Sequence, residues 1–96
     1  MKILHLTLHR KWFDMIVSGE KKEEYREIKP YWDKRLNKEY DAILFKNGYQ
    51  KNAPSVLVEL LDVTKGQGWE DLGAPRHEVY VLRLGRTIEV KNYERT

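Results

Sequence analysis

A chain of 96 residues with 41% hydrophobic side chains supports one hydrophobic core, so we expect a single domain over residues 1–96. The absence of cysteine excludes disulfides and thiolate chemistry, and no stretch has the apolar run that a signal peptide or a membrane-spanning helix requires. The formal net charge of +3 favours an anionic partner, although fifteen acidic residues oppose the eighteen basic ones, which would have to cluster.

A strand and a short helix are predicted at the start of the chain. Residues 2–9 alternate in polarity, and the alternation puts three leucines on the core face: Leu4, Leu6 and Leu8. Residues 10–18 follow helical spacing, and Gly19 comes next as the expected left-handed residue after a helix.

The next strand, predicted over residues 21–28, carries unusually many charges. Alternation places Glu24, Arg26 and Ile28 on one face and Glu23, Tyr25 and Glu27 on the other. We expect only one of these faces to be buried. Strict alternation would put Lys21 on the face opposite Glu24 and Arg26, unless the strand begins only after it. We expect the later start, because Gly19 ends the helix and Glu20 and Lys21 then form the turn, which lets Lys21 lean over the same opening as Glu24 and Arg26.

The remaining elements follow from turn signals and apolar alternation. They are a helix over 31–36, a strand over 41–46, a turn at Asn47-Gly48, a long strand over 55–64 with a bend or bulge, a loop over 65–76, a strand over 78–84 and an edge strand through Ile88 and Val90. The expected fold class is α+β, a small and mostly antiparallel β-barrel of five to six strands with two short helices.

The charged strand is the first candidate for a functional site. Side chains two residues apart on one strand face, about 6 to 7 Å between Cα atoms, can meet or flank one bound group, as Glu24 and Arg26 would. A buried charge without a partner costs several kcal/mol, so these two must pair with each other or with a ligand. Lys21 can act as nucleophile or base if its pKa is lowered, Glu24 can transfer a proton, and Arg26 can bind phosphate. The same three residues suit binding without reaction, and a solvated, salt-bridged strand is the structural alternative.

Five other residues are candidate ligand contacts. Tyr31, Trp32 and Tyr49 can stack on a base, while Lys46 and Asn47 can meet a phosphate and a base edge. Trp32 suits a place in the core equally well, and an asparagine before glycine is sufficiently explained by turn geometry. The three histidines are scattered, so we expect no metal site.

One motif carries a family resemblance. The spacing of Gly19, Lys21, Glu24 and Arg26 is similar to the G-x-K-x-x-E-x-R signature of the ASCH family, a branch of the PUA-like superfamily of small β-barrels. Residues 12–19, 24–32, 45–49 and 73–75 also resemble the small stand-alone ASCH proteins of phages and bacteria.

The resemblance implies a pocket in the barrel cleft, with RNA or a modified nucleoside as ligand. Some members are described as amidohydrolases that remove the acyl group of N4-acetylcytidine, using the motif lysine, which is Lys21 here. That reaction also uses a hydroxyl at the motif's sixth position, where this chain has Glu24, and a carboxylate from a later strand, for which Glu59 is the nearest candidate. Other members are described as ribonucleases.

Three functions remain open on the sequence. The first is an RNA- or nucleotide-binding module whose cleft is lined by Lys21, Glu24 and Arg26. The alternative is a hydrolase on the same scaffold, acting on an N4-acylated cytidine or on RNA through Lys21, with Glu24 and Glu59 as further catalytic residues. The second alternative is a non-catalytic interaction protein with a structural salt-bridged strand. We expect a cytoplasmic monomer without cofactor, metal or membrane partner.

Overall fold

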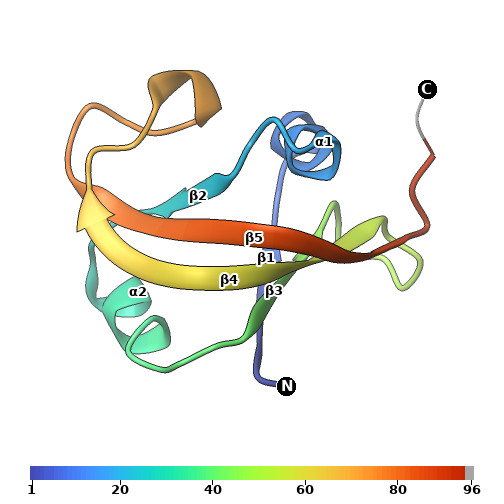
Figure 1. Ribbon diagram of the computed structural model, residues 1–96, viewed down its shortest axis with the longest axis horizontal. Helices are drawn as coiled ribbons and strands as arrows, with labels where there is room; N and C mark the ends of the chain where they lie inside the picture. The colour runs from blue at the N-terminus through green and yellow to red at the C-terminus, as the bar shows by residue number, and fades with distance from the viewer. Residues whose placement is uncertain (95–96) are drawn as a thin grey trace.

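The computed structural model describes residues 1–94 as a curled five-stranded sheet with two short helices (Figure 1). In chain order the elements are β1 (Ile3–Thr7), α1 (Arg10–Ser18), β2 (Glu23–Arg26), α2 (Pro30–Arg35), β3 (Ala42–Lys46), β4 (Ser55–Gly66), the 3-10 turn η1 (Glu70–Leu72) and β5 (Val79–Lys91). The predicted α+β class and the two short helices are confirmed.

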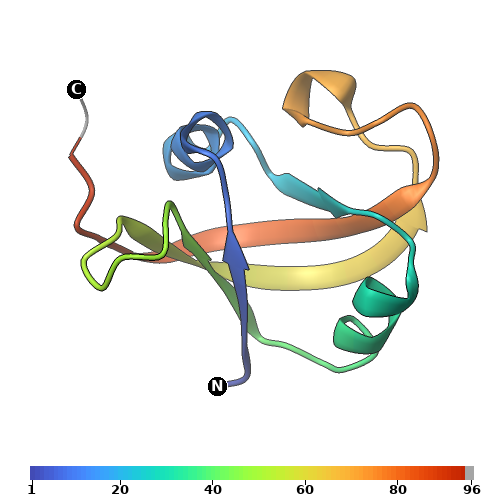
Figure 2. The same cartoon turned by 180° about the vertical axis from the view of Figure 1, so that it is seen from behind.

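The sheet has the strand order β1-β3-β4-β5-β2. Only β1 and β3 run parallel, and the other three pairs are antiparallel, as predicted. The pairing of β4 with β5 shifts register between Leu57 and Asp62, which confirms the expected irregularity in the long strand. Such irregularities bend a strand and increase its twist, so they curl this sheet. The edge strands β1 and β2 consequently return to the same side and leave a half-barrel (Figure 2).

The core lies inside the curl. Helix α1 buries Phe13 and Ile16 against the sheet, together with the three leucines that the alternation of residues 2–9 predicted. The other buried apolar members of this core are Trp32, Ile43, Phe45, Val56, Val58, Leu82 and Leu84. Both helices therefore pack on one core, and they lie at opposite ends of β2 (Figure 1).

The expectation that only one face of β2 is buried is wrong. Glu24 and Tyr25 are neighbours that point to opposite faces, and both are buried. Tyr25 packs with Val79, Val81 and Ala74 in a second apolar cluster. The loop that carries η1 covers this outer face, which alternation within β2 alone cannot reveal.

The two strands expected near the C-terminus form a single strand. Strand β5 runs without a break from Val79 to Lys91, because β4 pairs with it from Ser55 to Gly66. Strand β4 in turn extends to Gly66, into the segment that was predicted to be loop. The sheet therefore has five strands, at the lower end of the predicted number.

Candidate functional site

The end of α1 positions the first residue of the site. Gly19 adopts a left-handed φ of 86°, and its N–H donates to the Ile16 carbonyl at 3.1 Å. The chain then folds back under the helix, so the backbone N–H of Lys21 donates to the Met15 carbonyl at 2.9 Å. Lys21 thus lies in the turn before β2, as the glycine predicted, and its side chain points inward and is only 1% exposed.

Lys21, Glu24 and Arg26 form one ion-paired cluster, which we call the charged triad. The Lys21 ammonium lies 3.4 Å from Oε1 of Glu24. Arg26 donates to Oε2 of the same carboxylate, from Nε at 3.0 Å and from Nη2 at 2.5 Å. The side chains of Glu24 and Arg26 are 8% and 19% exposed. The carboxylate therefore serves one cation with each oxygen, and the triad keeps a net charge of +1 away from bulk water.

The Lys21 ammonium is surrounded by aromatic rings and one carbonyl. It lies 4.5 Å from the centre of the Tyr25 ring and 5.4 Å from that of Trp12, and it donates a hydrogen bond to the Leu72 carbonyl. Burial lowers the pKa of Lys21 below 10.5, because the charged form loses its hydration. The Glu24 carboxylate opposes this effect on the pKa, and Arg26 adds to it. The result is an amine that loses its proton more readily than a lysine in water.

A pocket of about 270 Å³ opens beside the triad, where β1 and β2 fail to close the barrel. Its lining consists of Thr7, Leu8, His9, Trp12, Lys21, Glu24, Tyr25, Arg26, Leu72 and Gly73. One wall therefore comes from the end of β1 and the start of α1, and the opposite wall from β2 and the loop that carries η1. The volume is just below the roughly 300 to 1,000 Å³ of typical small-molecule pockets, so it suits a ligand about the size of one nucleoside.

The loop between β4 and β5, residues 67–78, carries η1 and is called the η1 loop here. It forms the outer wall of the pocket. The backbone N–H of Trp69 donates to the Tyr25 hydroxyl at 3.2 Å. A Cβ atom at Gly68 would lie 2.4 Å from the Tyr25 ring, and one at Gly73 would lie 3.3 Å from Trp12. Glycine at both positions lets the loop backbone approach the aromatic walls. Trp12, Tyr25 and this loop are pocket residues that sequence reasoning missed, and the cluster of glycines in the loop was the available signal.

The predicted aromatic contacts of α2 lie next to the pocket. Trp32 is buried in the main core, and the Arg26 guanidinium carbon lies 5.0 Å from the centre of its ring. Tyr31 is 58% exposed and meets the Trp32 ring edge-on, with 4.9 Å between ring centres. Trp32 thus supports the site from within the core, while Tyr31 faces solvent.

The four other predicted site residues do not line the pocket. Lys46 is the last residue of β3. The side chain of Asn47, the next residue, donates to the Leu8 carbonyl at 3.0 Å and so joins the turn after β3 to the chain just after β1. Tyr49 is 91% exposed in that same turn. Glu59 lies on β4, where its carboxylate accepts the Arg86 backbone N–H at 3.3 Å. The structure therefore brings Lys21, Glu24 and Arg26 together and leaves these four apart from them.

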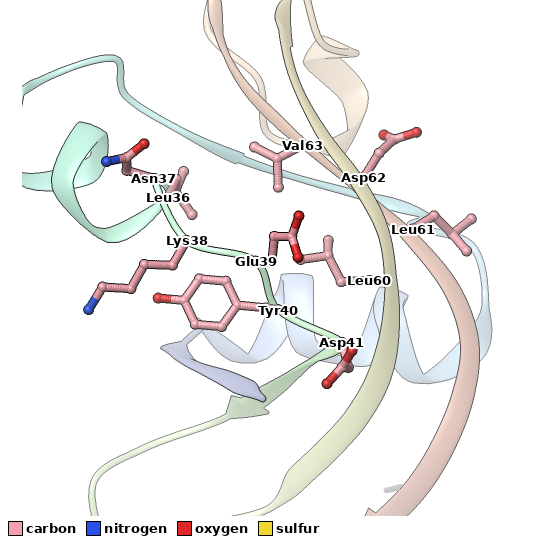
Figure 3. A pocket seen from close by; sticks show the side chains of 10 residues that line it. All are labelled: Leu36, Asn37, Lys38, Glu39, Tyr40, Asp41, Leu60, Leu61, Asp62 and Val63. Atoms are coloured by element: carbon pink, nitrogen blue, oxygen red, sulfur yellow. The ribbon is translucent and has the colours of Figure 1, made fainter. Parts of the chain in front are cut away.

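A second hollow, of about 500 Å³, lies between the linker after α2 and strand β4 (Figure 3). Leu60 and Val63 point toward the linker, whereas Leu61 points away from it. The Tyr40 hydroxyl donates to the Arg35 carbonyl, and the Asp41 carboxylate accepts the Lys2 N–H. The charged residues of its lining, Lys38, Glu39, Asp41 and Asp62, are exposed or half-buried, so the hollow lacks the buried charge of the triad.

Two further properties apply to residues 1–94. Their side chains include no group of three or more histidines, aspartates or glutamates placed to hold a metal ion. No helix in this part of the chain is long and apolar enough to cross a membrane.

Fold and site together define a class: a small half-barrel with a polar, aromatic-walled pocket between its two edge strands. The family model of the ASCH domain matches residues 6–93, nearly the whole chain. The protein belongs to the ASCH domain family, and its curled sheet agrees with the PUA-like placement of that family. Comparison with curated proteins and with solved structures gives no match.

Proposed function

We propose that the protein binds one nucleotide of RNA, or a modified nucleoside, in the pocket between β1 and β2. The charged triad carries the proposal. It holds a net positive charge beside a nucleoside-sized pocket. Burying ion pairs such as Lys21 and Glu24 is weak support for stability, because the loss of hydration can exceed the attraction between the charges, so a ligand is the better explanation of the triad. The aromatic walls from Trp12 and Tyr25 supply the apolar surface that a base requires.

Each member of the triad has a distinct part in this proposal. Arg26 has the most exposed side chain of the three and offers its guanidinium to a phosphate or a base carbonyl. Glu24 can accept a hydrogen bond from an exocyclic amine, as carboxylates do from cytosine. Lys21 holds the carboxylate in place and completes the positive potential of the pocket.

Calorimetric titration with cytidine monophosphate and with a short single-stranded RNA tests the proposal. We expect Arg26→Met to weaken both ligands about tenfold or more, because it removes a charge-assisted hydrogen bond. Arg83→Met is the matched control, since Arg83 also pairs with a carboxylate on the sheet but lies on the surface. Equal affinity of wild type and Arg26→Met, or equal losses in both variants, would overturn the proposal.

One observation favours a second function, hydrolysis of an acylated nucleoside such as N4-acetylcytidine, or of RNA. The buried Lys21 has a lowered pKa and lines the pocket, which suits a base that activates water. In this case Lys21→Ala abolishes product formation while ligand binding persists, and the wild-type rate rises with pH until Lys21 is deprotonated. If wild type forms no product from the acylated nucleoside and none from RNA, this second function is wrong, and the binding proposal is unaffected.

A further inference from the structure

Two arginines and two aromatic rings lead from the pocket to α2. The guanidinium carbons of Arg26 and Arg35 lie 5.0 and 5.1 Å from the centre of the Trp32 ring. Arg35 also lies 5.7 Å from the centre of the Tyr31 ring, which meets Trp32 edge-on. We call these four residues, Arg26, Tyr31, Trp32 and Arg35, the α2 platform. They join the triad to an exposed aromatic side chain without a gap.

The free edge of β1 fixes both arginines. Arg26 donates to the Thr7 carbonyl at 3.4 Å, and Arg35 donates to the His5 carbonyl at 3.1 Å. Alternate carbonyls of a strand point to the same side, so the two guanidinium groups lie along one edge. Each guanidinium carries five N–H donors and uses only part of them here, which leaves donors for a ligand.

Of the carboxylates near this edge, Glu24 pairs with Arg26, and Lys21 balances the charge of that carboxylate. Asp33 on α2 accepts the Tyr80 hydroxyl, and Glu27 lies 2.9 Å from Nε2 of His77. Neither carboxylate pairs with Arg26 or Arg35. The platform therefore offers two fixed cations to an anionic partner.

The platform continues the pocket as a surface. A further hollow of about 270 Å³ adjoins the pocket and shares Tyr25, Arg26 and Gly73 with it. The rest of its lining consists of Glu27, Trp32, Pro75 and Val79. Arg26 thus stands between two adjoining spaces of similar size. A ligand made of repeated units, with an anionic group between one unit and the next, fits this arrangement.

We infer that the ligand is a single-stranded RNA, with one nucleotide in the pocket and its neighbours on the α2 platform. The inference rests on the proposed function and names its substrate class. Arg26 and Arg35 contact successive phosphates, and Tyr31 stacks on an unpaired base. A duplex keeps its bases stacked on each other and cannot use Tyr31 in this way.

Fluorescence anisotropy with a short single-stranded RNA, compared with cytidine monophosphate, tests the inference. We expect Tyr31→Ala to weaken the RNA about tenfold, in line with base stacking in other single-strand binders, and to leave the mononucleotide unchanged. Tyr31→Phe keeps the ring and should keep the RNA affinity. Tyr49→Ala, which removes a more exposed tyrosine away from the platform, should change neither ligand.

The possible outcomes separate this inference from the proposed function. RNA that binds no tighter than the mononucleotide, duplex RNA that binds as tightly as the single strand, or equal losses in Tyr31→Ala and Tyr49→Ala would each overturn the single-strand path. A mononucleotide that still binds in an Arg26-dependent way would leave the proposed function standing. If neither ligand binds wild type, both proposals fail together.

Discussion

At the scale of single residues, Glu24 is the acceptor that holds the buried Lys21 and the half-buried Arg26 in place. Its Oε1 faces Lys21 and its Oε2 faces Arg26, so the carboxylate is what allows both positive side chains to lie at the pocket. Burying ions is costly in itself, but removing one partner of a formed group is costlier still, because the charges that remain are left without compensation.

We therefore expect Glu24→Gln to lower the free energy of unfolding by about 3 kcal/mol, as measured by urea denaturation. The double variant Lys21→Met with Glu24→Gln should recover part of this loss, because one of the two uncompensated cations is gone. Asp62→Asn is the control, since Asp62 also accepts from an arginine but on the surface, and its stability should stay close to wild type. A Glu24→Gln variant as stable as Asp62→Asn would contradict this account of the triad.

Tyr25 gives a prediction about pH. Burial raises the pKa of Tyr25 from 10.0 to about 12, and the hydrogen bond to Glu23 adds to the rise, while the N–H of Trp69 opposes it. Because the folded pKa lies above the unfolded one, the folded state holds the proton more tightly between these values. The stabilisation is complete below pH 10.0 and is lost as the pH rises toward about 12.

Urea denaturation on either side of pH 10.0 measures this effect. Wild type should lose stability above pH 10.0 more steeply than Tyr25→Phe, which keeps the packed ring without an ionisable group. Tyr49→Phe should follow wild type, because its hydroxyl lies in an exposed turn. Parallel curves for wild type and Tyr25→Phe would mean that Tyr25 does not titrate in this way.

The residues of the triad could be predicted from the sequence, but the choice between pairing with each other and pairing with a ligand could not. The spacing from Gly19 to Arg26 gave Lys21 its place in the turn and put Glu24 and Arg26 on one face, as the structure has them. Glu59, by contrast, lies on β4 apart from the pocket. The register shifts of β4 change which residues point to which side, so alternation along this strand could not predict the position of Glu59.

At the scale of elements, the η1 loop decides whether the pocket has an outer wall. The Leu72 carbonyl of the loop accepts a hydrogen bond from the Lys21 ammonium, and the Trp69 N–H donates one to the Tyr25 hydroxyl. The loop is therefore joined to both the triad and the aromatic wall. Gly68 permits this contact, since any Cβ there would lie 2.4 Å from the Tyr25 ring. Composition predicted a loop over 65–76, but long-range contacts, which a local pattern does not contain, determine what the loop covers.

We expect Gly68→Ala to destabilise the protein by about 1 to 3 kcal/mol, because the added methyl group forces the loop away from Tyr25. Ligand affinity should fall in the same variant as the wall of the pocket moves. Gly66→Ala is the matched control two residues earlier, where a Cβ would have no atom within 4 Å, and it should leave both quantities close to wild type. Thermal unfolding and titration with cytidine monophosphate measure the two effects.

At the scale of the whole molecule, the site exists because the barrel is not closed. Five strands in the order β1-β3-β4-β5-β2 leave two edges, and the register shifts of β4 bring these edges to the same side. Unpaired edges are usually covered or charged in natural sheets. Here Arg26 and Arg35 reach the carbonyls of β1, so the groups that protect the edge are also those that face the pocket and the platform.

The salt dependence of RNA binding tests whether these two arginines, and not the overall charge, attract the ligand. Each phosphate contact on a single strand contributes about −0.7 to the slope of log affinity against log salt concentration, so two contacts predict a slope of about −1.4. Arg35→Met should reduce that slope by about 0.7. Arg86→Met also takes the formal net charge from +3 to +2 but lies exposed on β5, and it should leave the slope unchanged. If the slope changes equally in Arg35→Met and Arg86→Met, the net charge of the protein attracts the RNA and the position of Arg35 does not matter.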